Sequence, residues 1–196
     1  MLAVGVTGIY AFHGIRESVR DNFAGDHPTK IDDYLYFTPA AAYLGLGFIP
    51  GMPCRSDFYS RLMAGTTAYA VMTAAECGMK FAFRERRPDS SQRNSFPSGH
   101  TATAFTGAEL MRIEYGNLTG LAGYAVAIAV GALRIYDNRH WINDVIGGAA
   151  VGILSARVGY WLLPYERRLF GLDKKDSHTS VAVVPSGMGL AVAVTF

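Results

Sequence analysis

Long stretches of apolar and small residues alternate with short polar segments along this chain. The apolar stretches cover residues 34–49, 58–83, 99–114, 118–135 and 145–163, and a further one covers residues 1–12. Most of them are too long for strands, and they end at Gly, Pro or charged residues, which is typical of helices. The pattern predicts an all-α fold, a compact bundle of about six helices.

Polar and helix-breaking residues set the expected helix ends. Asp57 suits the N-cap of the helix that begins at residue 58. Pro39 is expected to bend the helix before it or to mark its true start, and Pro164 is expected to end the last helix.

The C-terminal part of the chain has a different pattern. After a charged segment, residues 180–196 form two short runs in which Val and Ala alternate around a Pro and a Gly. Such runs predict a short β-hairpin or an extended tail. We therefore expect a single domain over residues 1–196, with its core at about 58–163 and a tail at about 165–196.

The composition favours a bundle embedded in a membrane. Half of the residues are hydrophobic and 17% are charged, below the ~25% of an ordinary soluble domain. As a helix, residues 145–163 would span roughly 28 Å, close to the ~30 Å hydrocarbon core. Arg157 lies within this stretch and must face the bundle interior if the helix crosses a bilayer. The mean hydropathy of +0.15 is modest for six spans, so a compact soluble helical protein stays an alternative.

A six-helix crossing pattern would bring the polar segments 84–98 and 134–144 to one side of the membrane. Residues 51–57 and the tail would lie on the other side. Six cations belong to that side: Arg55, Arg112, Arg167, Arg168, Lys174 and Lys175. By the positive-inside rule that second side is cytoplasmic, so the first side would face the periplasm or the cell exterior.

Net charge, the N-terminal stretch and the cysteines say less about the class of protein. The net charge of +2 is too small to indicate a nucleic-acid-binding protein. Residues 1–12 lack a basic n-region and are a weak match to a signal peptide. Cys54 and Cys77 lack metal-site spacing and fit either two thiols or one disulfide.

Three polar clusters interrupt the apolar pattern, at residues 80–88, 95–100 and 134–144. The first is rich in Arg and Lys. A basic loop on the surface would have a similar composition, so this cluster alone does not define a site.

His140 and Asp144 in the third cluster are four residues apart, so on a helix they share one face. A carboxylate bonded to one ring nitrogen fixes the tautomer and leaves the other nitrogen free as a nucleophile. A surface His–Asp pair would show the same spacing.

Ser98, Gly99 and His100 directly precede or begin a helical run. The N–H groups of a helix N-terminus attract anions, and Gly lets an anion approach closely. Ser98 can donate a hydrogen bond, and His100 could protonate a leaving oxygen as a general acid. An ordinary Ser-capped helix would have the same sequence.

Lys80, Arg87 and Arg134 could together neutralise a phosphoryl group and its transition state. The sequence contains no Cys-x-x-Cys, His-Glu-x-x-His or Asp-x-Asp run. We therefore expect no metal and no other cofactor.

In combination the clusters resemble the signature of the type 2 phosphatidic acid phosphatase superfamily, which includes membrane lipid phosphatases, bacterial acid phosphatases and vanadium haloperoxidases. The first motif is matched by Lys80, Arg87 and Pro88, the second by Pro97, Ser98, Gly99 and His100, and the third by Arg134, His140 and Asp144. Leu133 stands where the third motif usually has Ser, which puts one secondary contact in doubt.

The resemblance implies a role for each matched residue. His140 would form a phosphohistidine, Asp144 would orient it, and His100 would protonate the leaving group. The residues implied to hold the phosphate are Lys80, Arg87, Ser98, Gly99 and Arg134. Catalysis would need no metal.

The resemblance also implies a metal-independent phosphatase acting on lipid phosphate monoesters or pyrophosphates. Candidate substrates are phosphatidic acid, phosphatidylglycerol phosphate, undecaprenyl pyrophosphate and the phosphate groups of lipid A. The segments 32–41 and 94–105 are similar to envelope phosphatases of Gram-negative bacteria, which implies a bacterial inner membrane with the site facing the periplasm. A soluble periplasmic acid phosphatase, a vanadium-dependent haloperoxidase and a structural membrane protein stay open, and the sequence does not indicate an oligomeric state.

Overall fold

A computed structural model describes residues 14–25, 29–172, 180–186 and 189–195. Its helical segments are residues 14–23, α2 (Asp32–Leu35), α3 (Thr38–Gly45), the 3₁₀ turn η1 (Leu46–Phe48), α4 (Phe58–Phe83), α5 (Gly99–Tyr115), α6 (Asn117–Tyr136) and α7 (Ile142–Leu169). The predicted helical bundle is confirmed. The N-terminal stretch 1–12 lies outside the described residues.

The helix ends agree with the sequence in part. Asp57 caps α4, and its carboxylate accepts a hydrogen bond from the Ser60 N–H. Pro39 lies in the first turn of α3, so it marks a true helix start. The expected end at Pro164 is wrong, because α7 continues through it to Leu169. Proline removes only one helical hydrogen bond, and Arg residues in the last turn interact favourably with the helix C-terminus.

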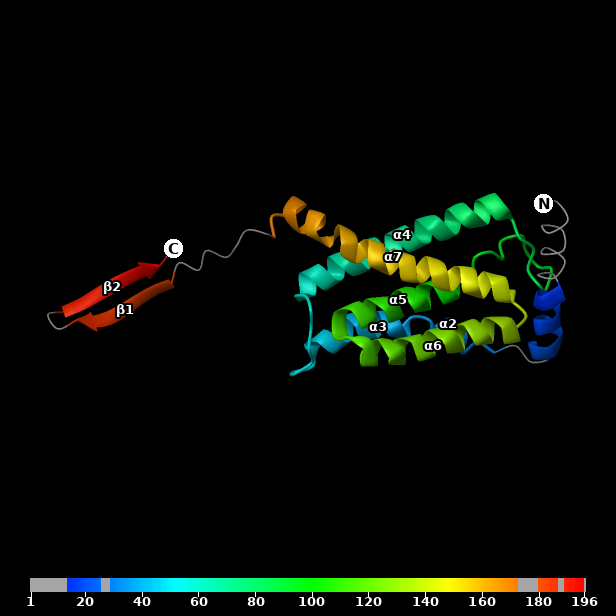
Figure 1. Cartoon of the computed structure of the whole chain (residues 1–196), viewed down its shortest axis with the longest axis horizontal. Helices are drawn as coiled ribbons and strands as arrows, with labels where there is room; N and C mark the ends of the chain where they lie inside the picture. The colour runs from blue at the N-terminus through cyan, green and yellow to red at the C-terminus, as the bar shows by residue number, and fades with distance from the viewer. Residues whose placement is uncertain (1–13, 26–28, 173–179, 187–188, 196) are drawn as a thin grey trace, which may run out of the picture. The chain divides into compact units, whose positions relative to one another are not determined.

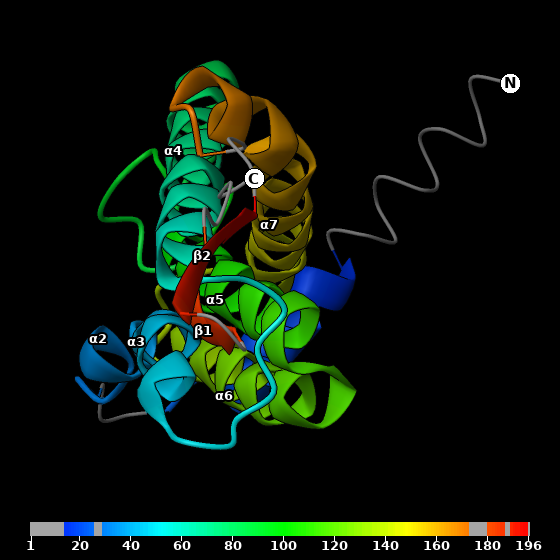
Figure 2. The same cartoon turned by 90° about the vertical axis from the view of Figure 1, so that its left-hand side faces the viewer.

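The central helix of the bundle is α5. Figures 1 and 2 show it between the pair α4 and α7 and the pair α3 and α6. One side of α5 packs against α3, α4 and α7 through Tyr43, Ala68, Leu110, Met111 and Ala156. The other side packs against α6 through Ala104, Ala108, Ala127 and Val130. Small side chains dominate this second contact and let the helices approach closely.

Two glycines show how close the approach is. A Cβ on Gly107 would lie 2.6 Å from the backbone nitrogen of Ala40 in α3. A Cβ on Gly152 would collide with the carbonyl oxygen of Ala102 and lie 2.9 Å from the nitrogen of Thr106, both in α5. These contacts are with backbone atoms, so neither position has room for a side chain.

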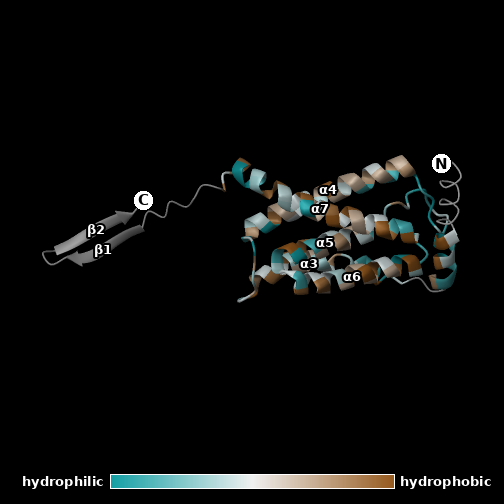
Figure 3. Ribbon diagram, in the orientation of Figure 1, coloured by the Kyte–Doolittle hydropathy of each residue, from teal (hydrophilic) through white to brown (hydrophobic). Residues whose placement is uncertain are grey.

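The outer surfaces of the long helices are apolar. Large hydrophobic side chains with more than 60% exposure lie on α4, α6 and α7: Tyr59, Phe81, Phe83, Leu118, Leu121, Ile128, Ile146, Leu154, Trp161 and Leu169. Figure 3 shows hydrophobic residues along the helices and hydrophilic residues in the segments that join them. By length and composition, α6 and α7 could each cross a membrane, with mean hydropathies of 1.7 and 1.4.

The Arg157 side chain on α7 is 62% exposed, so it does not face the bundle interior as a bilayer crossing requires, but its charge has a partner. Its Nε donates to Oε1 of Glu109 at 2.9 Å, and Glu109 is fully buried in α5. Arg112 and the hydroxyl of Tyr124 bind the same carboxylate. The negative charge of Glu109 is thus compensated within the bundle.

The chain divides into two compact units, Met1–Leu163 and Pro164–Phe196. In the second unit, β1 (Ser180–Ser186) and β2 (Gly189–Thr195) pair antiparallel, with Ser180 opposite Thr195. Of the two predicted alternatives, a hairpin or an extended tail, the structure shows the hairpin. In the first unit, Cys54 and Cys77 are two exposed, unpaired thiols.

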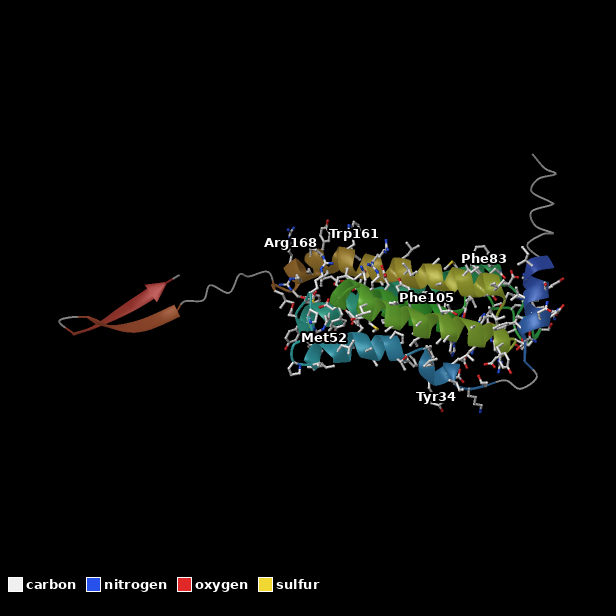
Figure 4. The ribbon with its side chains drawn as sticks, turned by 60° about the horizontal axis from the view of Figure 1, so that its bottom comes forward. Tyr34, Met52, Phe83, Phe105, Trp161 and Arg168 are labelled. Atoms are coloured by element: carbon white, nitrogen blue, oxygen red, sulfur yellow. The ribbon has the colours of Figure 1, made fainter. Side chains whose placement is uncertain are left out.

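The direction of α4 determines which segments meet. Figure 4 shows Met52, in the segment before α4, at one end of the bundle and Phe83, the last residue of α4, at the other. The segment 84–98, the start of α5 and the α6–α7 connection all lie at the Phe83 end (Figure 1). The three clusters of the sequence therefore meet at one end of the bundle.

Candidate active site

A cavity of about 290 Å³ lies where the three clusters meet. It is lined by six of the eight residues expected from the sequence, together with three others: Lys80, Arg87, Gly99, His100, Arg134 and His140, with Tyr36, Glu76 and Thr103. Residues as far apart in the sequence as Tyr36 and His140 thus form one polar pocket.

A tight turn after α6 positions His140. The carbonyl oxygen of Arg134 accepts hydrogen bonds from the backbone N–H groups of Arg139 and His140, at 3.1 and 3.2 Å. Asp144 lies in the first turn of α7 and is fully buried. Its Oδ2 accepts hydrogen bonds from the Ser95 hydroxyl at 2.5 Å and from the Trp141 N–H at 2.9 Å.

Asp144 faces the Nδ1 side of the His140 ring. Nδ1 lies 3.4 Å from Oδ2, close enough for an ion pair but without the geometry of a hydrogen bond. Since Nδ1 is turned toward this buried carboxylate, Nε2 is the ring nitrogen left for the cavity. Burial lowers the pKa of His140, and Arg134 and Arg87 act in the same direction, while Asp144 opposes them. Burial and the two arginines thus favour the neutral form of the imidazole.

Backbone contacts join the segment 84–98 to the third cluster. The indole N–H of Trp141 donates to the carbonyl oxygen of Arg86 at 2.8 Å, and the N–H of Ser98 donates to the carbonyl oxygen of Asp144 at 3.0 Å. The first and second motifs are thus both attached to the segment that carries His140.

The cations of the pocket are held in different ways. Arg134 is buried, and its guanidinium forms an ion pair with the equally buried Asp32 at 2.5 Å. Arg87 donates from Nε to Asn94 at 2.9 Å. Burial lowers the pKa of Arg87, and the charge of Arg134 lowers it further. Arginine stays protonated in proteins, so two cations that repel each other in one pocket favour the binding of an anion.

The N-terminus of α5 supplies further donors. Gly99 is its first residue and lines the cavity, as an anion site at a helix N-terminus requires. The Ser98 side chain is fully buried, and its hydroxyl lies 2.9 Å from Oγ1 of Thr101. The Ser98 hydroxyl is therefore directed to Thr101. Ser98 itself lies directly before the first residue of α5.

His100 lies between two cavities. Its Nε2 is 3.1 Å from Oδ1 of Asp33, which lies on α2. A second cavity, of about 380 Å³, shares Arg87, His100 and Arg134 with the first. It is otherwise lined by polar and charged residues: Thr29, Lys30, Asp32, Asp33, Asp137 and Arg139.

Asp32, Asp33 and His100 also bring one possible metal-ligand atom each to within 4.8 Å of one another. Asp32 is engaged by Arg134 and Asp33 by His100, so two of these groups already have partners. A cation here would also lie beside the Arg134 guanidinium, which is unfavourable.

Sequence reasoning missed several residues that position the pocket: Asp32, Asp33, Glu76, Asn94, Ser95 and Trp141. The Asp32–Asp33 pair has a visible signal, two adjacent acids before an aromatic run, but such acids also suit an ordinary helix N-terminus. The other four have no signal in a single sequence.

Comparison with known proteins gives a family and two curated relatives. Residues 76–168 match the family model of the PAP2 superfamily, the type 2 phosphatidic acid phosphatases. The chain is 43% identical over 153 residues to a lipid A 1-phosphatase of Porphyromonas gingivalis, an alignment that covers 76% of this chain. It is 39% identical over 71 residues, 36% of the chain, to the bacitracin transport permease protein BcrC of Bacillus licheniformis. The chain spans about a third of the length of these relatives, 34% of each.

Two solved structures share the fold. LpxE of Aquifex aeolicus superimposes with a TM-score of 0.54 at 20% identity, over 74% of this chain and 94% of that one. A transmembrane PAP2-type phosphatidylglycerolphosphate phosphatase of Bacillus subtilis superimposes with a TM-score of 0.55 at 19% identity, over 85% and 89%. These two structures show the fold. The family-model match over residues 76–168 and the 43% identity over 153 residues, with the three motifs around one cavity, show that the chain belongs to the PAP2 superfamily.

Proposed function

We propose that this protein is a metal-independent phosphatase that hydrolyses a lipid phosphate through a phosphohistidine. The observation that carries the proposal is one cavity in which His140, backed by buried Asp144, faces Lys80, Arg87 and Arg134. A neutral imidazole beside three cations can attack an anionic phosphorus centre.

In the first step, the Nε2 lone pair of His140 attacks phosphorus, and the bond between phosphorus and the ester oxygen breaks. The electron pair of that bond stays on the leaving oxygen, which takes a proton from His100. The three cations stabilise the charge on the other phosphoryl oxygens, and Asp144 stabilises the positive charge that His140 acquires.

In the second step, water attacks the phosphorus of the phosphohistidine. His100, now neutral, accepts a proton from this water, and the P–N bond breaks to return its electron pair to His140. Inorganic phosphate leaves, and both histidines regain their starting states. No step requires a metal, because the cations carry the charge stabilisation.

Two observations support a lipid substrate. The outer faces of α4, α6 and α7 expose large apolar side chains, which suits a bundle surrounded by lipid. The relative with 43% identity is named for the 1-phosphate of lipid A. Among the candidate substrates we therefore propose a lipid A phosphate first, and phosphatidic acid, phosphatidylglycerol phosphate and undecaprenyl pyrophosphate after it.

The second cavity supports the same order of candidate substrates. A leaving group opposite His140 would extend past His100, where this cavity offers both carboxylates and cations. A sugar with hydroxyl and amide groups can form hydrogen bonds there, whereas a diacylglycerol can form them only through its ester oxygens.

We propose that the site opens toward the periplasm, since the three motifs share one end of the bundle.

Release of inorganic phosphate from purified lipid phosphates and from soluble esters tests the proposal, with and without EDTA. We expect release from at least one lipid phosphate, unchanged by EDTA, and strongest for lipid A.

Trapping of the intermediate tests the phosphohistidine. Rapid acid-free quenching after mixing with ³²P-labelled substrate should leave label on the wild-type chain and none on His140→Ala. Undiminished activity of His140→Ala would refute the mechanism, and loss on chelation would direct attention to the Asp32, Asp33 and His100 group.

A further inference from the structure

Glu76 places a carboxylate inside the cavity where phosphate is proposed to bind. It lies on α4 one helical turn before Lys80, and its side chain is 16% exposed. The same cavity is lined by the cations, Gly99 and both histidines. An acid in a pocket for a phosphate dianion has no role in the two chemical steps above.

The contacts of Glu76 are those expected of a bound anion. Its Oε1 accepts a hydrogen bond from Nζ of Lys80 at 2.5 Å. The same carboxylate covers Gly99, because a Cβ added there would collide with Oε1 and lie 3.0 Å from Cδ and 3.2 Å from Oε2. Gly99 begins α5, so this oxygen pair lies at a helix N-terminus, where N–H groups and the dipole attract negative charge.

We infer that Glu76 is an internal anion that occupies part of the phosphate site and competes with phosphate for it. The inference rests on the proposed function, since it takes this cavity as the phosphate site. An incoming phosphate must move the carboxylate away from Lys80 and Gly99, or bind beside it against the repulsion of two like charges.

This competition makes Glu76 a specificity-determining residue. The repulsion grows with the charge of the ligand, and it weakens the binding of inorganic phosphate as it does that of a dianionic monoester. The product would leave more readily, and a terminal phosphate beside further phosphates would be disfavoured relative to a monoester. Lys80 can still reach the substrate, because an ammonium group has three donors.

The variant Glu76→Gln tests the inference, because it removes the charge and keeps both the size and an oxygen acceptor for Lys80. Purified full-length protein in detergent is titrated calorimetrically with inorganic phosphate and with vanadate. We expect Glu76→Gln to bind both anions about tenfold more tightly than wild type, which corresponds to ~1.4 kcal/mol. Glu17→Gln is the matched control, since it makes the same change at an exposed position on residues 14–23 and should leave both affinities unchanged.

Equal or weaker anion binding by Glu76→Gln would overturn the inference, because the carboxylate would then serve only to hold Lys80 in place. If Glu76→Gln does not fold, as judged by its thermal midpoint, Glu76→Asp retains the charge but withdraws it from Gly99. It should tighten binding by a smaller factor, and no tightening overturns the inference. Binding is measured without turnover, so a wild type that binds phosphate but hydrolyses nothing would refute the proposed function alone.

Discussion

At the scale of single residues, burial sets the chemistry of His140. Its side chain is buried against Asp144, and burial together with Arg134 and Arg87 lowers its pKa. A base with a lowered pKa stays unprotonated in more acidic solution than free imidazole, whose pKa is ~6.5. We therefore expect the acid limb of kcat/KM of the free enzyme to lie below pH ~6.5.

The variant Asp144→Asn tests whether His140 controls the acid limb of the pH profile. Asp144 is the group that raises the pKa of His140 against the other influences, so its loss lowers that pKa further. The acid limb of the pH profile should move to lower pH, while the maximal rate falls because the imidazolium loses its compensating charge. A full pH profile of both proteins measures the two effects separately. A shift of the acid limb to higher pH would show that His140 does not control it.

In the first step, His100 is expected to act on the leaving group. A general acid contributes most when the leaving oxygen is strongly basic, so His100→Ala should slow the first phosphoryl transfer about 10²- to 10⁴-fold for an alkyl or glycosyl phosphate. The loss should be much smaller for p-nitrophenyl phosphate, whose leaving group departs without a proton. Asp33→Asn should change kcat in the same direction by a smaller factor, because Asp33 contacts His100 at Nε2. Equal losses for both leaving groups would argue against the acid role.

At the scale of the helices, the site depends on how closely α7 approaches α5. Gly152→Ala would place a Cβ against backbone atoms of Ala102 and Thr106, which cannot move without shifting α5. Overpacking of this kind costs about 1–3 kcal/mol, so we expect a lower thermal midpoint in detergent. The control is Gly78→Ala on α4, where a Cβ meets nothing within 4 Å and should stabilise the helix by about 0.5–1 kcal/mol. A midpoint of Gly152→Ala at or above that of wild type would contradict this packing.

The same scale shows what a single sequence can predict. The ends of α4 follow from local chemistry, an Asp57 cap at one end and polar residues after Phe83 at the other, so the sequence predicts them. The continuation of α7 through Pro164 does not follow, since it depends on the whole helix outweighing one lost hydrogen bond.

In the site, the motif residues could be predicted, because residue types at this spacing are those that a phosphate-binding and phosphate-cleaving site needs. Asp32 and Glu76 could not, because their positions depend on how α2 and α4 pack against α5 and α6.

At the scale of the whole molecule, the distribution of apolar surface bears on where the protein resides. Leu118, Leu121 and Ile128 on α6 are each more than 60% exposed, as are Ile146 and Leu154 on α7. Exposure of this extent is unfavourable in water but suits contact with lipid, and both helices are long and apolar enough to cross a bilayer. The Arg157 side chain is 62% exposed, so a position of α7 within a bilayer depends on the ion pair of this residue with Glu109.

We therefore expect the full chain to sediment with membranes and to remain there after washing with alkaline carbonate or high salt. These treatments remove proteins held by charge, whereas helices in the hydrocarbon core are released only when detergent replaces the lipid. The measurement is the share of the protein, and of phosphate release, in each fraction. Release by osmotic shock without detergent would instead support a soluble periplasmic phosphatase. In that case the exposed faces of α6 and α7 would have to be covered by protein, and the purified chain would form oligomers in the absence of detergent.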